Sequence, residues 1–207
     1  MSLAAEPTVV IVPGLRDHVR DHWQTLLAER LAEAGRVVRT VPPLERERLS
    51  LEAQVGNLAA ALAPLHGPIL LVAHSAGVMT TVHWAQRHRA DVRGALLATP
   101  PDFETPLPAG YPTGVELAAH GWTPVPRKPL PFPSVVAASA NDPLGAPECV
   151  AELARSWDSR LVELGAVGHL NPASGYGEWP LAEELIRILE SDSCSAPLEE
   201  TPTGGHP

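Results

Sequence analysis

The sequence predicts an α/β fold in which helices cover both faces of a six-stranded, mostly parallel sheet, forming a three-layer sandwich. Six short β-type runs alternate with five helical patterns, which is typical of parallel strands joined by crossover helices. Right-handed crossovers place the helices on both faces of the sheet. The chain has 207 residues, 44% of them hydrophobic and 19% charged, which is enough for one domain with a core.

The expected elements follow one another in regular order. The strands lie near residues 8–12, 36–40, 68–73, 93–98, 134–139 and 160–165. The helices lie near residues 19–34, 50–65, 76–90, 146–157 and 178–190. Together they predict a single domain over residues 1–190. Residues 191–207 lack periodicity and are rich in Ser, Pro, Thr and Gly, so we expect a disordered tail there.

The first two helices carry clear local signals. The helix at 19–34 has one apolar stripe at spacings of three and four, formed by Trp23, Leu26, Leu27, Leu31 and Ala34. Gly35 follows as a plausible stop for that helix. The helix at 50–65 is expected to begin at Ser50, with Glu52 and Gln54 in its first turns.

The third strand runs directly into a serine. His74-Ser75-Ala76-Gly77 joins the apolar run to a helical pattern, which is the layout of a sharp turn that lifts a serine hydroxyl out of the sheet. Such turns usually have glycine two residues before and two residues after the serine, because side chains there would meet the neighbouring backbone. Gly77 fits this pattern, and Ala73 replaces the first glycine at the cost of one methyl group. Taken alone, an ordinary strand-to-helix junction is the alternative.

Residues 99–133 interrupt the alternation after the fourth strand. They hold ten of the chain's 23 prolines and several aromatic residues. Loops of this length in compact domains are usually functional or disordered, and the aromatic residues argue against disorder. We expect a lid-like wall over the serine, with Phe103, Trp122 and Phe132 in contact with the substrate. The alternative is an irregular packing segment without substrate contact.

The last two strands lead to groups that can activate the serine. A serine hydroxyl needs a base to take its proton and a third group to orient that base. Asp142 follows the fifth strand and His169 follows the sixth, at the same edge of the predicted sheet as Ser75. The chain order Ser, Asp, His is that of the α/β-hydrolases. Asp102, after the fourth strand, is the rival for the acid.

An oxyanion hole needs two backbone N–H groups directed at the developing negative charge. Ala76, directly after the serine, is expected to supply one. The other is expected from Leu15, in the loop after the first strand, where Gly14 permits a tight reversal. An ordinary βα loop is the alternative reading of that loop.

Other features argue against competing classes of protein. His18 and His22 are four residues apart, but Val19 stands where a zinc-binding H-E-x-x-H motif needs glutamate, so no metal is expected. Cys149 and Cys194 give neither a disulfide framework nor a metal spacing, which favours a reducing cytoplasm. The net charge of −9 argues against nucleic acid and anionic membranes as partners, and no apolar run is long enough for a membrane span.

Several segments together resemble a known family, the retinoblastoma-binding-protein-9-like small serine hydrolases. The segments are Val12-Pro13-Gly14, His22-Trp23, residues 73–77, Leu130-Pro131-Phe132-Pro133-Ser134, Ala140-Asn141-Asp142-Pro143, Gly168-His169-Leu170-Asn171 and residues 174–180 (SGYGEWP). The resemblance implies a compact α/β-hydrolase without a large cap domain and with strand order 2-1-3-4-5-6. It also implies catalytic roles for Ser75, Asp142 and His169. No Leu-x-Cys-x-Glu segment is present, so a retinoblastoma partner is not expected.

The sequence therefore predicts a serine hydrolase that cleaves a small ester, thioester or amide through an acyl-enzyme on Ser75, without a cofactor. A non-catalytic interaction module on the same fold is the first alternative, since a fold does not determine a function. Acyl transfer to an alcohol or amine is the second. The abundance of arginine beside one lysine, Lys128, is typical of a GC-rich bacterial genome.

Overall fold

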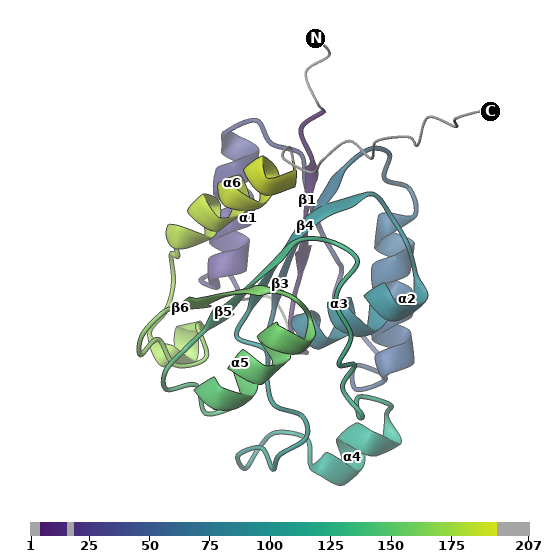
Figure 1. The fold of residues 1–207 in the computed structure, drawn as a ribbon, viewed down its shortest axis with the longest axis vertical. Helices are drawn as coiled ribbons and strands as arrows, with labels where there is room; N and C mark the ends of the chain where they lie inside the picture. The colour runs from purple at the N-terminus through teal and green to yellow at the C-terminus, as the bar shows by residue number, and fades with distance from the viewer. Residues whose placement is uncertain (1–4, 16–18, 194–207) are drawn as a thin grey trace, which may run out of the picture.

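The computed structural model describes residues 5–15 and 19–193 (Figure 1). The strands are β1 (Thr8–Val12), β2 (Val38–Thr40), β3 (Ile69–His74), β4 (Val92–Ala98), β5 (Ser134–Ala138) and β6 (Arg160–Glu163). The helices are α1 (Trp23–Glu33), α2 (Leu51–Leu62), α3 (Ala76–Arg87), α4 (Gly114–Ala119), α5 (Pro147–Ser156), α6 (Leu181–Ser193) and the 3-10 helix η1 (Pro172–Ser174).

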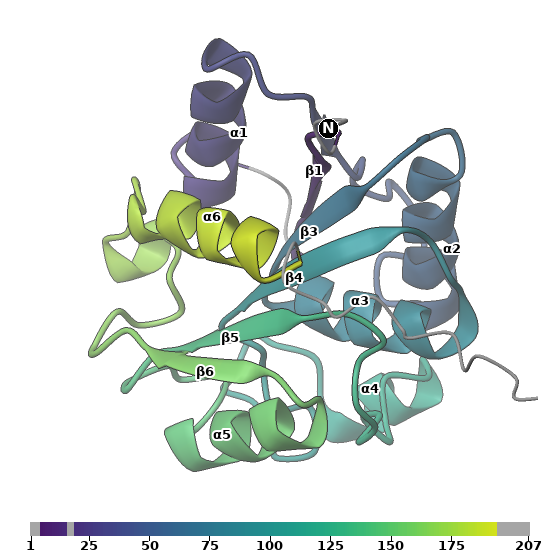
Figure 2. The same cartoon turned by 45° about the horizontal axis from the view of Figure 1, so that its top comes forward.

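The six strands form one sheet in the order β2-β1-β3-β4-β5-β6, and every pair is parallel. Their side chains alternate between two apolar cores. On β1, Val9 and Ile11 lie in the core with α1 and α6, whereas Val10 and Val12 lie in the core with α2, α3 and α5. Figure 2 shows α6 on one side of the sheet and α5 on the other. The predicted α/β-hydrolase sandwich and its strand order are confirmed.

The helix ends follow from their capping groups. α1 begins at Trp23, later than expected, because the His22 ring accepts a hydrogen bond from the Gln24 N–H and so caps the helix. Ser50 caps α2 as expected, through a bond from the Ala53 N–H. The last helix, α6, begins only after Pro180 and continues to Ser193, so the chain from 191 to 193 is helical and not part of a tail. Residues 194–207 lie outside the described residues.

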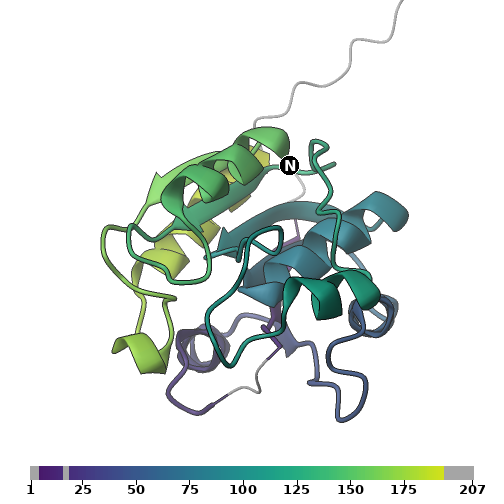
Figure 3. The ribbon, with the colours of Figure 1, turned by 90° about the horizontal axis from the view of Figure 1, so that it is seen from below.

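The segment between β4 and β5 contains a helix that we did not expect. α4 is closed at its start by a capping box in which Thr113 and Glu116 exchange hydrogen bonds. Leu117 and Trp122 anchor the segment, since both side chains are fully buried. α4 lies at the bottom of Figure 1 and faces the viewer in Figure 3, beyond the carboxyl ends of the strands.

Within the described residues, none of the helices has the length and apolar character that crossing a membrane requires.

Candidate active site

Ser75 stands at the turn between β3 and α3 in a conformation that is rare for residues other than glycine. Its backbone has φ 56° and ψ −129°, and its N–H donates to the Ala98 carbonyl at 3.0 Å. Such strain persists only where the surroundings determine it, and here a sheet bond on one side and a buried helix on the other hold the turn. The turn directs the hydroxyl away from the sheet.

Two glycines allow close packing around this turn. A Cβ on Gly77 would lie 2.3 Å from the Val12 carbonyl oxygen, so only glycine lets α3 approach the end of β1 this closely. A Cβ on Gly14 would lie 3.2 Å from the Cβ of Ser75. Ala73, which replaces the usual first glycine, is fully buried with its methyl group in the core on the α2 and α3 side. The substitution is thus accommodated by core packing.

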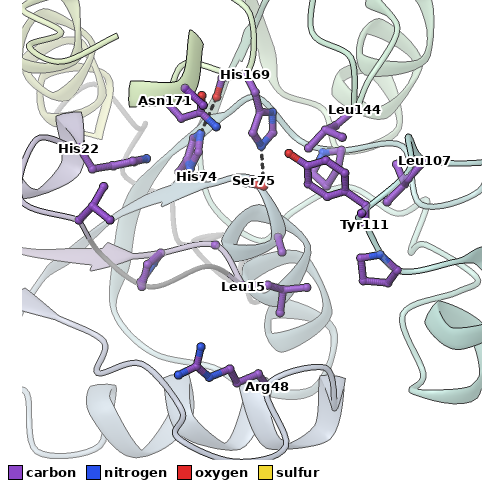
Figure 4. A pocket seen from close by; sticks show the side chains of 18 of the residues that line it. Leu15, His22, Arg48, His74, Ser75, Leu107, Tyr111, Leu144, His169 and Asn171 are labelled. Carbon is purple, nitrogen blue, oxygen red and sulfur yellow. Dashed lines mark hydrogen bonds between the residues drawn. The ribbon is translucent and has the colours of Figure 1, made fainter. Parts of the chain in front are cut away.

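Ser75, His169 and Asp142 meet at the carboxyl ends of β3, β6 and β5. Figure 4 shows the His169 ring directed at Ser75. The Nε2 of His169 lies 2.7 Å from the Ser75 Oγ. The Nδ1 of His169 lies 2.8 Å from Oδ2 and 3.0 Å from Oδ1 of Asp142. Asp142 Oδ1 also accepts the Leu144 N–H at 2.9 Å, which fixes the carboxylate. The structure thus brings together the three side chains that the sequence singled out.

The loop that carries His169 is held through its backbone. The His169 N–H donates to the Ser174 hydroxyl at 3.0 Å, and that hydroxyl donates to Asn171 Oδ1 at 2.9 Å. The Gly168 N–H donates to Asn141 Oδ1 at 2.6 Å. A Cβ on Gly168 would lie 2.5 Å from the Ser174 Oγ, so the position requires glycine. These hydrogen bonds hold the backbone on either side of the His169 imidazole in place.

Ser139, Asn141 and Gln24 support the site without having been predicted. The Gln24 side chain is fully buried and donates to the carbonyls of Val12 at 3.2 Å and Val72 at 3.0 Å, which ties α1 to the ends of β1 and β3. Ser139 donates to Asn141 Oδ1 at 3.0 Å. A polar residue between Trp23 and Leu27 on an otherwise apolar helix face is the one signal that pointed to Gln24.

Asp102, the alternative candidate for the acid, forms its hydrogen bonds within its own loop. Its two carboxylate oxygens accept the Glu104 N–H at 3.0 Å and the Thr105 hydroxyl at 2.9 Å. A hydrogen bond from the Cys149 thiol to the same carboxylate raises the pKa of that thiol. Asp102 therefore stabilises the start of the 99–133 segment, and Asp142 alone of the two contacts the imidazole.

A cavity of about 450 Å³ opens beside Ser75, lined mainly by apolar side chains. Leu15 and Ala76, the two residues predicted to form the oxyanion hole, both line it. Ala76 is the first residue of α3, so its N–H belongs to the turn whose N–H groups have no acceptor within the helix. Tyr111, on the 99–133 segment, also lines the cavity, and Figure 4 shows its hydroxyl directed toward His169 and Ser75.

The three aromatic residues predicted to bind substrate have different places. All three are buried in the same core, but only Phe103 also lines the cavity. The Trp122 indole N–H donates to the Leu49 carbonyl at 2.6 Å, and its ring packs edge-on against Phe103 at a centroid distance of 5.3 Å. Trp122 and Phe132 thus hold the segment against the domain, and the predicted substrate contact is not retained for them.

Of the two histidines four residues apart near the chain start, the structure describes one. His18 lies outside the described residues, and His22 caps α1. Among the residues that the structure describes, no group of three or more His, Cys, Asp or Glu side chains is arranged to hold a metal ion.

Known proteins share this architecture. A YdeN-like hydrolase from Pectobacterium atrosepticum is 28% identical over 89% of this chain and 90% of its own, with a TM-score of 0.71. The ydeN gene product of B. subtilis is 22% identical over 90% and 100% of the two chains, with a TM-score of 0.68. A monoacylglycerol lipase from Paleococcus ferrophilus is 17% identical over 92% and 96%, with a TM-score of 0.65. The last two are less than 25% identical to this chain, so their likeness shows a shared fold alone.

Curated protein sequences give no match to the chain. The family model described as serine hydrolase matches residues 9–188, which include all but the first residue of the six strands and most of α6. The chain belongs to the serine hydrolase family.

Proposed function

We propose that this protein hydrolyses a small ester, thioester or amide through an acyl-enzyme on Ser75, as a member of the retinoblastoma-binding-protein-9-like branch of its family. The observation that carries the proposal is the unbroken line of hydrogen bonds from the Ser75 hydroxyl through the His169 ring to Asp142, at 2.7 and 2.8 Å. The line ends in an apolar cavity that is large enough for a small molecule.

In the first half of the reaction, the Ser75 Oγ attacks the substrate carbonyl carbon while His169 Nε2 takes the hydroxyl proton. The negative charge that develops on the carbonyl oxygen is stabilised by the N–H groups of Leu15 and Ala76. His169 then gives its proton to the departing alcohol, thiol or amine, which leaves the acyl group on Ser75. Asp142 keeps the Nδ1 proton in place and stabilises the charged ring.

In the second half, water takes the place of the leaving group. His169 removes a proton from the water as the oxygen attacks the acyl carbon, and returns that proton to the Ser75 Oγ as the acid departs. The same groups serve both halves, so the cycle needs no cofactor.

The experiment that tests this proposal is covalent labelling with a fluorophosphonate, followed by peptide mapping. The wild type should be labelled on Ser75, and Ser75→Ala should lose labelling and several decades of kcat, keeping at most the residual ~10³-fold over water. Ser156→Ala is the matched control, because that exposed hydroxyl only donates to the Glu152 carbonyl. Equal labelling of the wild type and Ser75→Ala would overturn the proposal.

The size of the cavity limits the length of the acyl group that the site can bind. A volume of about 450 Å³ is near the lower end of ligand sites, which range over ~300–1,000 Å³. Leu107, Tyr111 and Phe103 bound the cavity from the 99–133 segment. Acetyl and butyryl p-nitrophenyl esters should therefore have higher kcat/KM than dodecanoyl and longer esters. A steady rise of kcat/KM with chain length would show that acyl chains are bound outside this cavity.

A further inference from the structure

His74 is a buried histidine at the centre of the site that the proposed reaction does not use. It is the last residue of β3, directly before Ser75, and its side chain is buried. Its ring lies between two other imidazoles, with centroids 4.8 Å from His22 and 5.0 Å from His169, and meets the edge of Trp23 at 5.9 Å. Figure 4 shows it beside His169, on the side away from Tyr111.

One ring nitrogen of His74 binds the backbone of the proposed base. The Nε2 of His74 lies 2.9 Å from the carbonyl oxygen of His169. A carbonyl oxygen can only accept, so Nε2 carries the proton and donates it. The three aromatic neighbours pack around the His74 ring in edge-on or tilted contacts. The bond is short, buried and between residues 95 positions apart.

This bond and the Ser75 bond form a closed arrangement. Two consecutive residues of the turn reach two parts of one residue: Ser75 Oγ contacts the His169 side chain at 2.7 Å, and His74 Nε2 contacts the His169 main chain at 2.9 Å. Because His74 and Ser75 are joined by a peptide bond, the His74 contact fixes the position of the His169 backbone relative to the Ser75 hydroxyl.

We infer that His74 is a positioning residue that sets the distance between the nucleophile and the base. The inference rests on the proposed function and deepens it. Leu170, directly after His169, has φ 48°, a left-handed conformation that is unfavourable for leucine and persists only while the surrounding contacts hold the loop. Ser174 and Asn141 support the N–H side of the loop, and His74 supports the carbonyl side.

Loss of the His74 bond should reduce the rate of the chemical step and leave substrate binding nearly unchanged. A displacement of about 1 Å costs on the order of 10² in rate. We therefore expect His74→Phe, which keeps a ring and removes the donor, to lower kcat and the fluorophosphonate labelling rate by about 10- to 100-fold, with KM within about twofold.

Rescue by a matched donor separates positioning from simple packing. Glutamine places its side-chain N–H₂ about where Nε2 stands, whereas asparagine places it nearer Nδ1. His74→Gln should recover most of kcat, and His74→Asn should not. This pair also tests the inference if His74→Phe fails to fold. Equal kcat in the Gln and Asn variants, or wild-type kcat in the Phe variant, would overturn the inference.

His83 provides the control for losing a buried histidine. It is buried on α3, and its Nε2 lies 3.3 Å from the Trp122 carbonyl, away from the site. His83→Phe should lower the thermal midpoint without a matching loss of kcat. If it loses kcat as His74→Phe does, the His74 effect is one of general stability and the inference fails.

A readout besides activity keeps the inference distinct from the proposed function. Imidazole nitrogen NMR of the wild type should show a His74 Nε2–H protected from exchange with water, and that signal should persist in Ser75→Ala. Absence of a protected His74 Nε2–H would overturn the inference whatever the enzyme assays show. Its presence in a protein whose Ser75 does not react would overturn the proposed function alone.

Discussion

Two aspartates stand at neighbouring strand ends and differ in what they contact. Asp142 faces the His169 imidazole with both oxygens, while Asp102 accepts hydrogen bonds from its own loop at Glu104 and Thr105. Burial is the same for both, with 8% of each residue exposed, so exposure does not distinguish them. The two residues differ in the groups that their carboxylates contact.

Asp142→Asn should lower kcat by about 10⁴-fold, because an amide offers an N–H to Nδ1 and favours the wrong imidazole tautomer. Asp102→Asn should leave kcat within about threefold, since its partners are a loop N–H and a hydroxyl. Steady-state kinetics on one short ester compares the two. A larger loss in Asp102→Asn would assign the acid role to that residue.

At the scale of single residues, chain order predicted which serine, acid and histidine would meet, because parallel strands end at one edge of the sheet. The direction in which each side chain faces was harder to predict. Trp122 and Phe132 lie in a proline-rich segment without periodicity, so nothing in the sequence distinguishes a side chain that faces the core from one that faces the cavity. The bond from Gly168 to Asn141 joins residues 27 positions apart and has no local signature.

Gly77 on α3 and Gly56 on α2 have opposite surroundings. On α3, a Cβ at Gly77 would meet the Val12 and Pro13 carbonyl oxygens at 2.3 and 2.5 Å. On α2, a Cβ at exposed Gly56 would have no atom within 4 Å. Gly77 lets α3 approach the end of β1, whereas Gly56 lowers the helix propensity of α2 and has no packing role.

Gly77→Ala should lower the free energy of unfolding by about 3 kcal/mol or prevent folding, because fixed backbone atoms and not a flexible side chain occupy the space. Gly56→Ala should raise it by about 0.5–1 kcal/mol through reduced freedom of the unfolded chain. Urea unfolding of both variants measures the two effects. Equal destabilisation by the two changes would contradict the account of α3.

At the scale of elements, the strands were predicted to within two residues. The central strands β3 and β5 are fully buried and read as continuous apolar runs. The edge strands β2 and β6 are largely exposed, and each was predicted two residues too long at one end. Helix starts depended on caps: the His22 cap moved α1, and Pro180 moved α6, relative to the periodic pattern. α4 was missed because six residues among prolines are too few to show a helical period.

The stability of the whole molecule should depend on pH through His83. Burial lowers the pKa of this histidine below its ordinary value of 6.5, outweighing the hydrogen bond to the Trp122 carbonyl, and nearby Arg87 lowers it further. The unfolded chain therefore binds a proton at a pH where the folded protein does not. The His83 contribution is fully present above pH 6.5 and is lost as the pH falls below that value.

His83→Gln should make the free energy of unfolding less dependent on pH between 8 and 5 than in the wild type, because glutamine does not titrate. Urea unfolding of both proteins at pH 8, 6.5 and 5 gives the comparison. The difference between the two curves should open only below about pH 6.5, near the reference histidine value. Parallel curves over the whole range would contradict the assignment.

The line of hydrogen bonds from Ser75 through His169 to Asp142 joins distant parts of the chain. Ser75 and His169 are 94 positions apart, and His169 and Asp142 are 27 apart, so the line exists only when β3, β5 and β6 are in register. A short pulse of a serine-directed probe would therefore count native molecules during refolding. Far-ultraviolet circular dichroism would also count collapsed molecules whose helices have formed around an incomplete sheet. The delay between the two signals would measure how late the sheet closes.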